Sequence, residues 1–164
     1  MLLSIYCTIT GAKQGTFKGE SPLTQHAQSI PCLAFESGVS VPFDKPTGQA
    51  TGRRSWVPIK FTKELGAASP QILQACVTNE VLSDVVFGFY HLTPAGEEEL
   101  VYSVHLTNAT ITGIGQSTNP PLHSSPGRDY DRQEVEVIEM TYRKIEVASP
   151  TAKTAFSDDW SASP

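Results

Sequence analysis

The segment from Thr51 to Cys76 constrains the fold more than any other part of this chain. It opens with a glycine turn that carries two arginines. Val57, Ile59 and Phe61 then fall on one side of an extended backbone, as in a β-strand with one buried face. A helical pattern follows directly, so this one segment predicts a turn, a strand and a helix in succession.

The predicted helix is short and spans about residues 69–79. Ser69 is expected to act as its N-cap, with Pro70 at the first helical position, where the missing N–H of proline does no harm. The residues expected on its apolar face are Ile72, Leu73, Cys76 and Val77. No other segment has a convincing helical pattern, which favours a chain built mainly from strands.

Elsewhere the apolar residues alternate with polar ones, which is the pattern of half-buried strands. The expected strands cover residues 3–9, 30–35, 39–43, 84–92, 100–106, 109–114 and 134–147. In the last of these, the apolar positions begin with Val135 and Val137, change phase at Ile138 and change again at Ile145, which indicates a β-bulge. We therefore predict a mainly β fold, a compact β-barrel or β-sandwich with one short flanking α-helix and an extended loop at about residues 39–54.

The chain of 164 residues is long enough for one domain with a single core. We place this domain at residues 1–149 and treat residues 150–164 as a C-terminal tail. Residues 116–133 form a long loop rich in serine and proline, whose conformation the pattern leaves open. Several strands have apolar residues on both faces, such as Val85 beside Val86. Part of the sheet therefore needs a cover from the helix, a loop or another subunit.

Composition and charge bear on the partners of the chain. The net charge of −5 argues against nucleic-acid binding, which needs a basic face. No apolar segment approaches the length of a membrane span, so we expect no membrane insertion. The first residues alternate in polarity and lack a basic leader, so we expect no cleavable signal peptide. The three cysteines lie far apart and are expected to be reduced thiols.

The sequence contains no recognisable arrangement of catalytic residues. The four histidines lack the spacing of metal ligands. Ser103, His105 and Asp84 have the side chains of a hydrolytic triad, but no nucleophile elbow is present and Ser103 and His105 share one strand face. We therefore predict no catalytic residue, no cofactor and no metal, and a protein that is not an enzyme.

Several motifs in order along the chain resemble one protein family. They are residues 47–54 (TGQATGRR), 58–65 (PIKFTKEL), 69–70 (SP), 87–90 (FGFY), 134–145 (EVEVIEMTYRKI) and 157–160 (SDDW). Together these motifs resemble the haemolysin-coregulated protein (Hcp) family, the tube subunits of the bacterial type VI secretion system. The similarity covers nearly the whole chain.

This resemblance implies a β-barrel with a flanking helix that assembles into a hexameric ring. Rings stack into a tube that a contractile sheath expels, so the partners are further copies, the sheath, the spike and effector proteins. By the same resemblance, the subunit is expected to be made in the bacterial cytoplasm and exported by the secretion system. The extended loop is expected to reach the adjacent ring. The residues expected to make contacts there are Asp44, Lys45, Gln49, Arg53 and Arg54.

Two alternatives belong to other functional classes. One is a monomeric β-barrel that binds a small apolar ligand in its interior. It requires a roomy cavity, whereas large inward side chains are expected to fill a barrel of this size. The other is an enzyme in which a toxin domain follows the tube subunit. The sequence reaches Pro164 soon after the last expected strand, which argues against this alternative.

Overall fold

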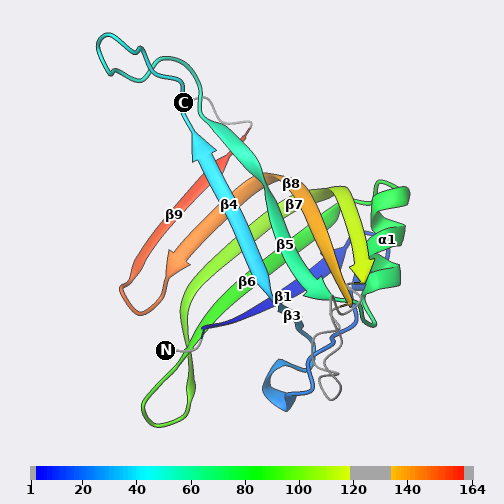
Figure 1. The fold of residues 1–164 in the computed structure, drawn as a ribbon. Helices are drawn as coiled ribbons and strands as arrows, with labels where there is room; N and C mark the ends of the chain where they lie inside the picture. The colour runs from blue at the N-terminus through cyan, green and yellow to red at the C-terminus, as the bar shows by residue number, and fades with distance from the viewer. Residues whose placement is uncertain (1–2, 119–133, 161–164) are drawn as a thin grey trace, which may run out of the picture.

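The computed structural model describes residues 3–118 and 134–160. The elements are β1 (Leu3–Gly11), β2 (Gly15–Thr16), the 3₁₀ turn η1 (Thr24–His26), β3 (Ile30–Cys32), β4 (Ala34–Ser40), β5 (Ser55–Glu64), α1 (Ser69–Val77), β6 (Leu82–Leu92), β7 (Glu98–Thr118), β8 (Glu134–Ser149) and β9 (Thr154–Asp159). Figure 1 shows a strongly curved sheet with α1 at one end and the segment between β4 and β5 projecting at the other.

The described strands form one nine-stranded sheet in the order β2-β1-β6-β7-β8-β5-β4, with β3 paired to β1 and β9 paired to β8. All the pairs that join these strands are antiparallel. The predicted mainly β fold with one flanking helix is confirmed, and so is the extended loop. The barrel is not closed, because β4 and β2 remain separate edges among the described strands.

Strand β7 joins two of the predicted strands into one. It runs for 21 residues without a turn, where the pattern predicted separate strands at 100–106 and 109–114. Asn108 lies inside it with a φ of 51°, a conformation that asparagine tolerates better than most residues. A register shift between Ile111 and Gly113 then adds a residue to β7 relative to β8. Because of these local distortions, the buried positions shift from Val104 and Leu106 to Ala109 and Ile111. This shift explains why the sequence pattern suggested two separate strands.

The helix α1 packs against β7, but with a different face and a different cap from those predicted. Its N-cap is Ala68, and Ser69 is already the first helical residue. The buried face consists of Ser69, Ile72 and Ala75, whereas Val77 is 83% exposed. The prediction of the apolar face was therefore wrong at Leu73 and Val77. The Ser69 hydroxyl is used instead in a buried polar cluster described below.

The inner face of the curved sheet carries the core. The ring of Phe87 contacts those of Phe35 and Phe61 edge-on, with centroids 4.9 and 5.2 Å apart. On β8 the buried positions are Glu136, Ile138, Met140 and Tyr142, followed by Ile145. The phase change predicted before Ile138 was wrong, because the inward residue there is Glu136 rather than a valine. The change before Ile145 is present.

The residues predicted as a C-terminal tail include a strand. β9 pairs with the second half of β8, from the pair Lys144–Asp159 to the pair Ser149–Thr154. The predicted loop at 116–133 begins later than expected, since β7 continues to Thr118, and its residues 119–133 lie outside the described part of the chain. Among the described residues, α1 is far too short to cross a bilayer, and no other helix has the necessary length and apolarity.

Candidate subunit-contact surfaces

The segment between β4 and β5, residues 41–54, forms an arm that projects from the body of the molecule (Figure 1). Its tip is closed by its own hydrogen bonds. The backbone N–H of Asp44 donates to the Gln49 carbonyl at 2.8 Å, and that of Gly48 donates to the Asp44 carbonyl at 2.7 Å. The Thr47 hydroxyl donates to the Asp44 carboxylate at 2.6 Å. The tip is therefore a defined turn that holds its shape without a partner.

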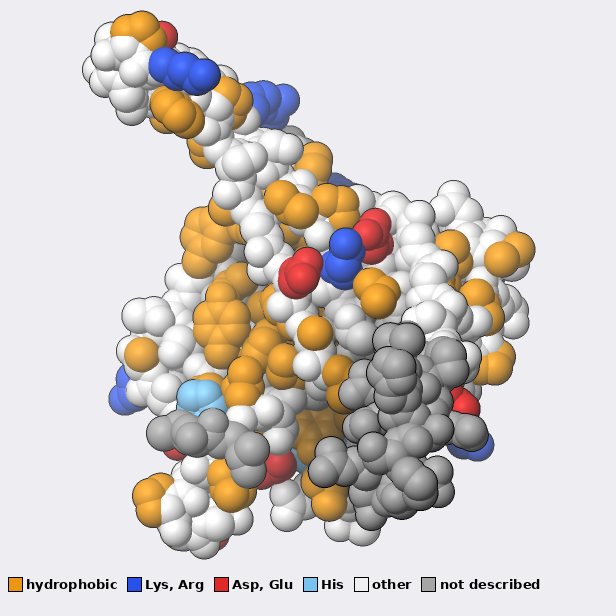
Figure 2. Space-filling model, in the orientation of Figure 1, with side chains coloured by type: hydrophobic (Ala, Val, Ile, Leu, Met, Phe, Trp, Pro, Cys, Tyr) orange, Lys and Arg blue, Asp and Glu red, His pale blue; other side chains and the backbone are white. Residues whose placement is uncertain are grey.

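The arm presents apolar and basic side chains to solvent. Phe43 is 62% exposed, and Val41 is exposed beside it. Lys45 is also exposed, and no hydrogen bond or ion pair engages it within the described residues. Figure 2 shows hydrophobic and basic side chains together on the arm. Exposed apolar side chains on a projecting turn are typical of a contact with another protein.

The base of the arm is attached to the last strand, β9. The guanidinium of Arg54 binds the Asp158 carboxylate through two nitrogens, and its Nη2 also donates to the Asp159 carbonyl at 3.0 Å. The indole N–H of Trp56 donates to the same Asp158 carboxylate at 2.7 Å. Hydrogen bonding from Arg54, assisted by that from Trp56, lowers the pKa of Asp158 below its ordinary value. We call this cluster the arm anchor.

Replacing Asp158 with alanine is expected to release the arm anchor without unfolding the sheet. The indole N–H resonance of Trp56 should move, and amide hydrogen exchange at residues 51–56 should accelerate at least about tenfold, because the opening equilibrium loses charge-assisted hydrogen bonds. Ser157→Ala, on the exposed neighbouring residue, is the matched control. Unchanged exchange in the Asp158 variant would contradict the anchor.

The arm anchor should weaken as the pH falls. Because the pKa of Asp158 is lowered in the folded protein, the contact contributes fully above the ordinary aspartate pKa. It is lost as the pH falls through the lowered value. The Trp56 resonance should therefore titrate below the range of an ordinary aspartate.

The five predicted contact residues fall into two groups. Asp44, Lys45 and Gln49 lie together at the tip, and Arg53 is exposed near the base of the arm. Arg54 instead turns back onto the body at the arm anchor. Their role in contacts between copies stays a prediction. The anchor partners Trp56 and Asp158 were missed, because Arg54 and Asp158 are 104 residues apart in the sequence.

A buried ionic cluster was also missed. Lys63 is 0% exposed, and its Nζ lies 3.0 Å from Glu20 Oε1 and 2.8 Å from Glu136 Oε1. The Ser69 hydroxyl donates to Glu136 at 2.8 Å, and Gln116 donates to its other oxygen at 2.9 Å. Burial raises the pKa of Glu136, but hydrogen bonds from Gln116, Lys63 and Ser69 outweigh burial and the pKa is lowered. Glu136 is therefore ionised inside the fold, where it helps to join β5, β8 and α1.

Apolar side chains remain exposed beyond the arm. Those on or beside the outer strands are Leu33, Val39, Val57 and Phe156, followed by Trp160 after β9. Val57, for example, is 52% exposed on β5. Figure 2 shows hydrophobic side chains gathered across one face of the open sheet, below the arm. A monomer rarely leaves so much apolar sheet surface in water.

The Ser103, His105 and Asp84 group does not have the geometry of a hydrolytic triad. The ring of His105 is held at both nitrogens, by Asp84 at 2.7 Å and by Glu146 at 3.1 Å. Neither nitrogen is left to accept a proton from Ser103. Within the described residues, no group of histidine, cysteine, aspartate and glutamate side chains has the arrangement of a metal site.

Comparison with known proteins decides the family. The sequence model of a family described as "Type VI secretion system effector, Hcp" matches residues 6–148. The chain belongs to the Hcp family. The matched range runs from β1 to near the end of β8, so it includes the arm and leaves β9 outside.

Individual Hcp relatives match over nearly their whole length. The "Major exported protein" of Pseudomonas aeruginosa is 31% identical over 171 residues, with 98% of this chain and 96% of that protein covered. A crystal structure of an Hcp protein superimposes with a TM-score of 0.89 at 27% identity, covering 99% of this chain and 100% of the other. The secreted protein Hcp3 from Pseudomonas aeruginosa gives 0.78 at 25% identity, covering 98% and 100%.

Proposed function

We propose that this Hcp-family chain is a structural subunit that forms hexameric rings, that the rings stack into the inner tube of a type VI secretion system, and that the tube carries effectors out of the cell. In this role the chain has no catalytic activity. It is made in the cytoplasm and leaves by the secretion system, with the sheath, the spike and effectors as its other partners. The name of the exported Pseudomonas relative supports this route.

The observation that carries this proposal is the open sheet with its exposed apolar side chains. β4 is an edge strand that pairs only with β5 among the described strands, and Val39, Val57 and Phe156 lie exposed on or near the outer strands. Burying such surface is favourable by about 25 cal/mol for each Å² removed from water, so these faces favour association. A ring in which each subunit uses one face against each neighbour covers two different patches on every copy.

The arm supports stacking as the second level of assembly. It projects beyond the sheet (Figure 1) and carries Asp44, Lys45 and Gln49 at a preformed tip. Arg53 adds a cation near its base, while Arg54 fixes the base to β9. A projection of this kind contributes little to the subunit's own core and is suited to a contact with the next ring.

The interior gives less support to the alternative of a small apolar ligand. Phe61, Phe87 and Ile138 are fully buried, and the two phenylalanine rings contact each other directly. The described part of the sheet is thus filled by its own side chains. A ligand would have to displace this packing, which ordinarily reaches the density of an organic crystal.

Light scattering coupled to size exclusion tests the ring. We expect a particle with a mass six times that of the 17.8 kDa chain, and electron micrographs should show rings with a hollow centre. Val57→Glu should shift the particle towards monomers by placing a charge in an apolar contact, while the circular dichroism spectrum stays unchanged. Val77→Glu, at an exposed valine on α1, is the control and should leave the particle intact. A wild-type protein that stays monomeric at high concentration would overturn the proposal.

A further inference from the structure

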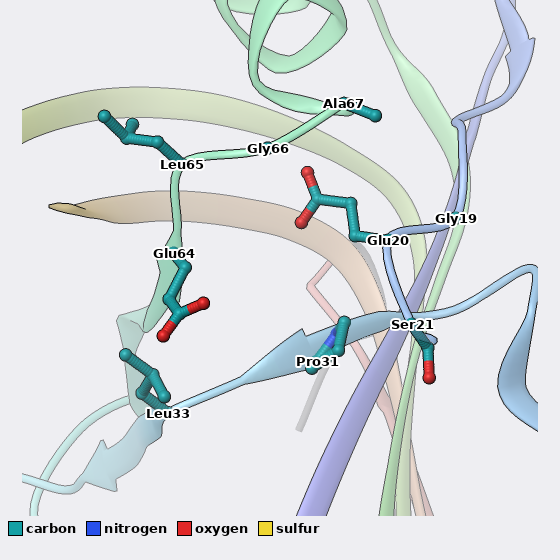
Figure 3. Close-up of a pocket in the computed structure, with 9 residues that line it drawn as sticks. All are labelled: Gly19, Glu20, Ser21, Pro31, Leu33, Glu64, Leu65, Gly66 and Ala67. Carbon is teal, nitrogen blue, oxygen red and sulfur yellow. The ribbon is translucent and has the colours of Figure 1, made fainter. Parts of the chain in front are cut away.

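A pocket of about 510 Å³ lies where β5 ends and the chain turns towards α1. Figure 3 shows its lining, with the Glu20 and Glu64 side chains on opposite walls and Leu33 and Pro31 along one side. Leu65 completes the apolar part of the lining. The pocket therefore combines an apolar wall with two carboxylates.

The two carboxylates differ in whether they are open to a contact with another molecule. Glu20 is committed inside the molecule, because it accepts hydrogen bonds from Lys63 and from the backbone N–H of Ala68 at 2.8 Å. The exposed Glu64 carboxylate has no hydrogen bond or ion pair within the described residues. Glu64 is thus a free anion beside exposed Leu33, and this pair fits a partner with a cation next to an apolar side chain.

The arm carries that combination. Lys45 is an exposed cation without a partner among the described residues, and Phe43 is the most exposed phenylalanine of the described chain. The arm and the pocket lie at opposite ends of β5, which has ten residues and therefore spans about 30 Å. The arm of one molecule is directed away from its own pocket (Figure 1), so it must enter the pocket of another copy.

Resting on the tube function proposed above, we propose that the pocket formed by Leu33, Glu64 and Leu65 receives the arm tip of a second copy, with Phe43 against the leucines and Lys45 paired with Glu64. The two surfaces are different and face opposite ends of the molecule. A contact between different surfaces repeats head to tail. Such a repeat makes an open-ended stack of rings, which is the geometry of a tube.

A charge exchange tests the contact. Glu64→Lys and Lys45→Glu should each leave rings intact but raise the protein concentration needed for tube formation roughly tenfold or more, because like charges then face each other at every arm. The double variant should return to within about twofold of the wild type, since the pair is restored with opposite orientation. Glu97→Lys makes the same charge change at an exposed residue outside the pocket lining and is the control. Equal effects of Glu64→Lys and Glu97→Lys, or no rescue in the double variant, would overturn the pairing.

A cross-link separates this inference from the ring itself. In a background with Cys32 and Cys76 replaced by serine, Lys45→Cys combined with Glu64→Cys should give chains linked by a short bis-maleimide reagent in concentrated protein, because a direct disulfide is too short to span the Cα atoms of a lysine–glutamate pair. Either variant alone in that background should stay uncross-linked. Cross-linking without rings would support the arm contact and reject the hexamer. Rings and tubes without cross-linking would reject the arm contact and keep the tube. The absence of both would reject both.

Discussion

Replacing Lys63 with methionine is expected to lower the free energy of unfolding by about 3–5 kcal/mol, the usual cost of leaving one partner of a buried ion pair alone. Lys63 lies within 3.0 Å of Glu20 and 2.8 Å of Glu136, and the Glu136 side chain is itself fully buried. Without the ammonium group, Glu136 keeps only its neutral donors, Ser69 and Gln116. Urea unfolding at fixed protein concentration measures the change, since assembly also contributes to apparent stability.

Lys60→Met on the same strand is the matched control. Lys60 pairs with Glu139 at 3.1 Å, but both side chains are 43% exposed. Pairs of this kind contribute about 0–1 kcal/mol, so the control should remain close to the wild type. Equal losses in the two variants would contradict the assignment of Lys63 to a buried cluster.

The Lys63 variant should also change the response to acid. In the wild type the pKa of Glu136 is lowered, so its contribution to stability is complete above the ordinary glutamate pKa and is lost as the pH falls through the lowered value. In the variant, burial is less strongly opposed and the pKa should rise. The stability difference between the two proteins should therefore become smaller as the pH falls.

Replacing Phe87 with alanine is expected to cost about 3–5 kcal/mol, the range for removing a large aromatic ring from a core. Phe87 is 0% exposed, and its ring lies against those of Phe35 and Phe61 from two other strands. The substitution removes all of these contacts and leaves a cavity that the surrounding sheet fills only in part. Thermal and urea unfolding should both detect the loss.

Phe43→Ala is the control with the same chemistry on the surface. At 62% exposure, Phe43 contributes little to the fold, and its loss should change the free energy of unfolding of a single subunit by less than about 0.5 kcal/mol. It should instead weaken tube formation, since we assign it to the contact between copies. A large loss of subunit stability in Phe43→Ala would contradict the description of the arm as an external feature.

Much of the fold follows from alternation along the strands. Ile59 and Phe61 are buried as their spacing predicts, but Val57, which was predicted on the same buried face, is 52% exposed. The pattern also located β1, β6 and the helix α1. Helix capping was less predictable, because Ser69 has two competing uses for its hydroxyl. Its position in the cluster depends on Lys63 from the preceding strand and on Glu136, which is 67 residues further along the chain.

The buried charges show why the pattern fails at particular places. An alternation search expects apolar residues at inward positions, so it assigned Val135 and Val137 to the inside of β8 and passed over Glu136. The burial of Glu136 becomes understandable only once Lys63 is known to lie on the neighbouring strand β5. Pairing between strands is a tertiary property, and a single sequence without relatives carries little information about it.

In the candidate contact surface too, some features could be predicted from the sequence and others could not. The tip residues Asp44 and Gln49 are close in sequence, and the resemblance to the Hcp family was enough to group them. The partner of Arg54 lies on β9, in a segment that composition assigned to a tail. The sequence thus predicted the arm itself, but not what anchors it.

The closed turn at the arm tip has a consequence for the contact between copies proposed above. Asp44 binds the Thr47 hydroxyl and exchanges backbone hydrogen bonds with its neighbours before any second molecule is near. The turn is therefore already in one conformation before a second copy binds, so little conformational entropy is lost on docking. In the tube proposed above, such a rigid projection would favour correctly registered addition of one ring after another.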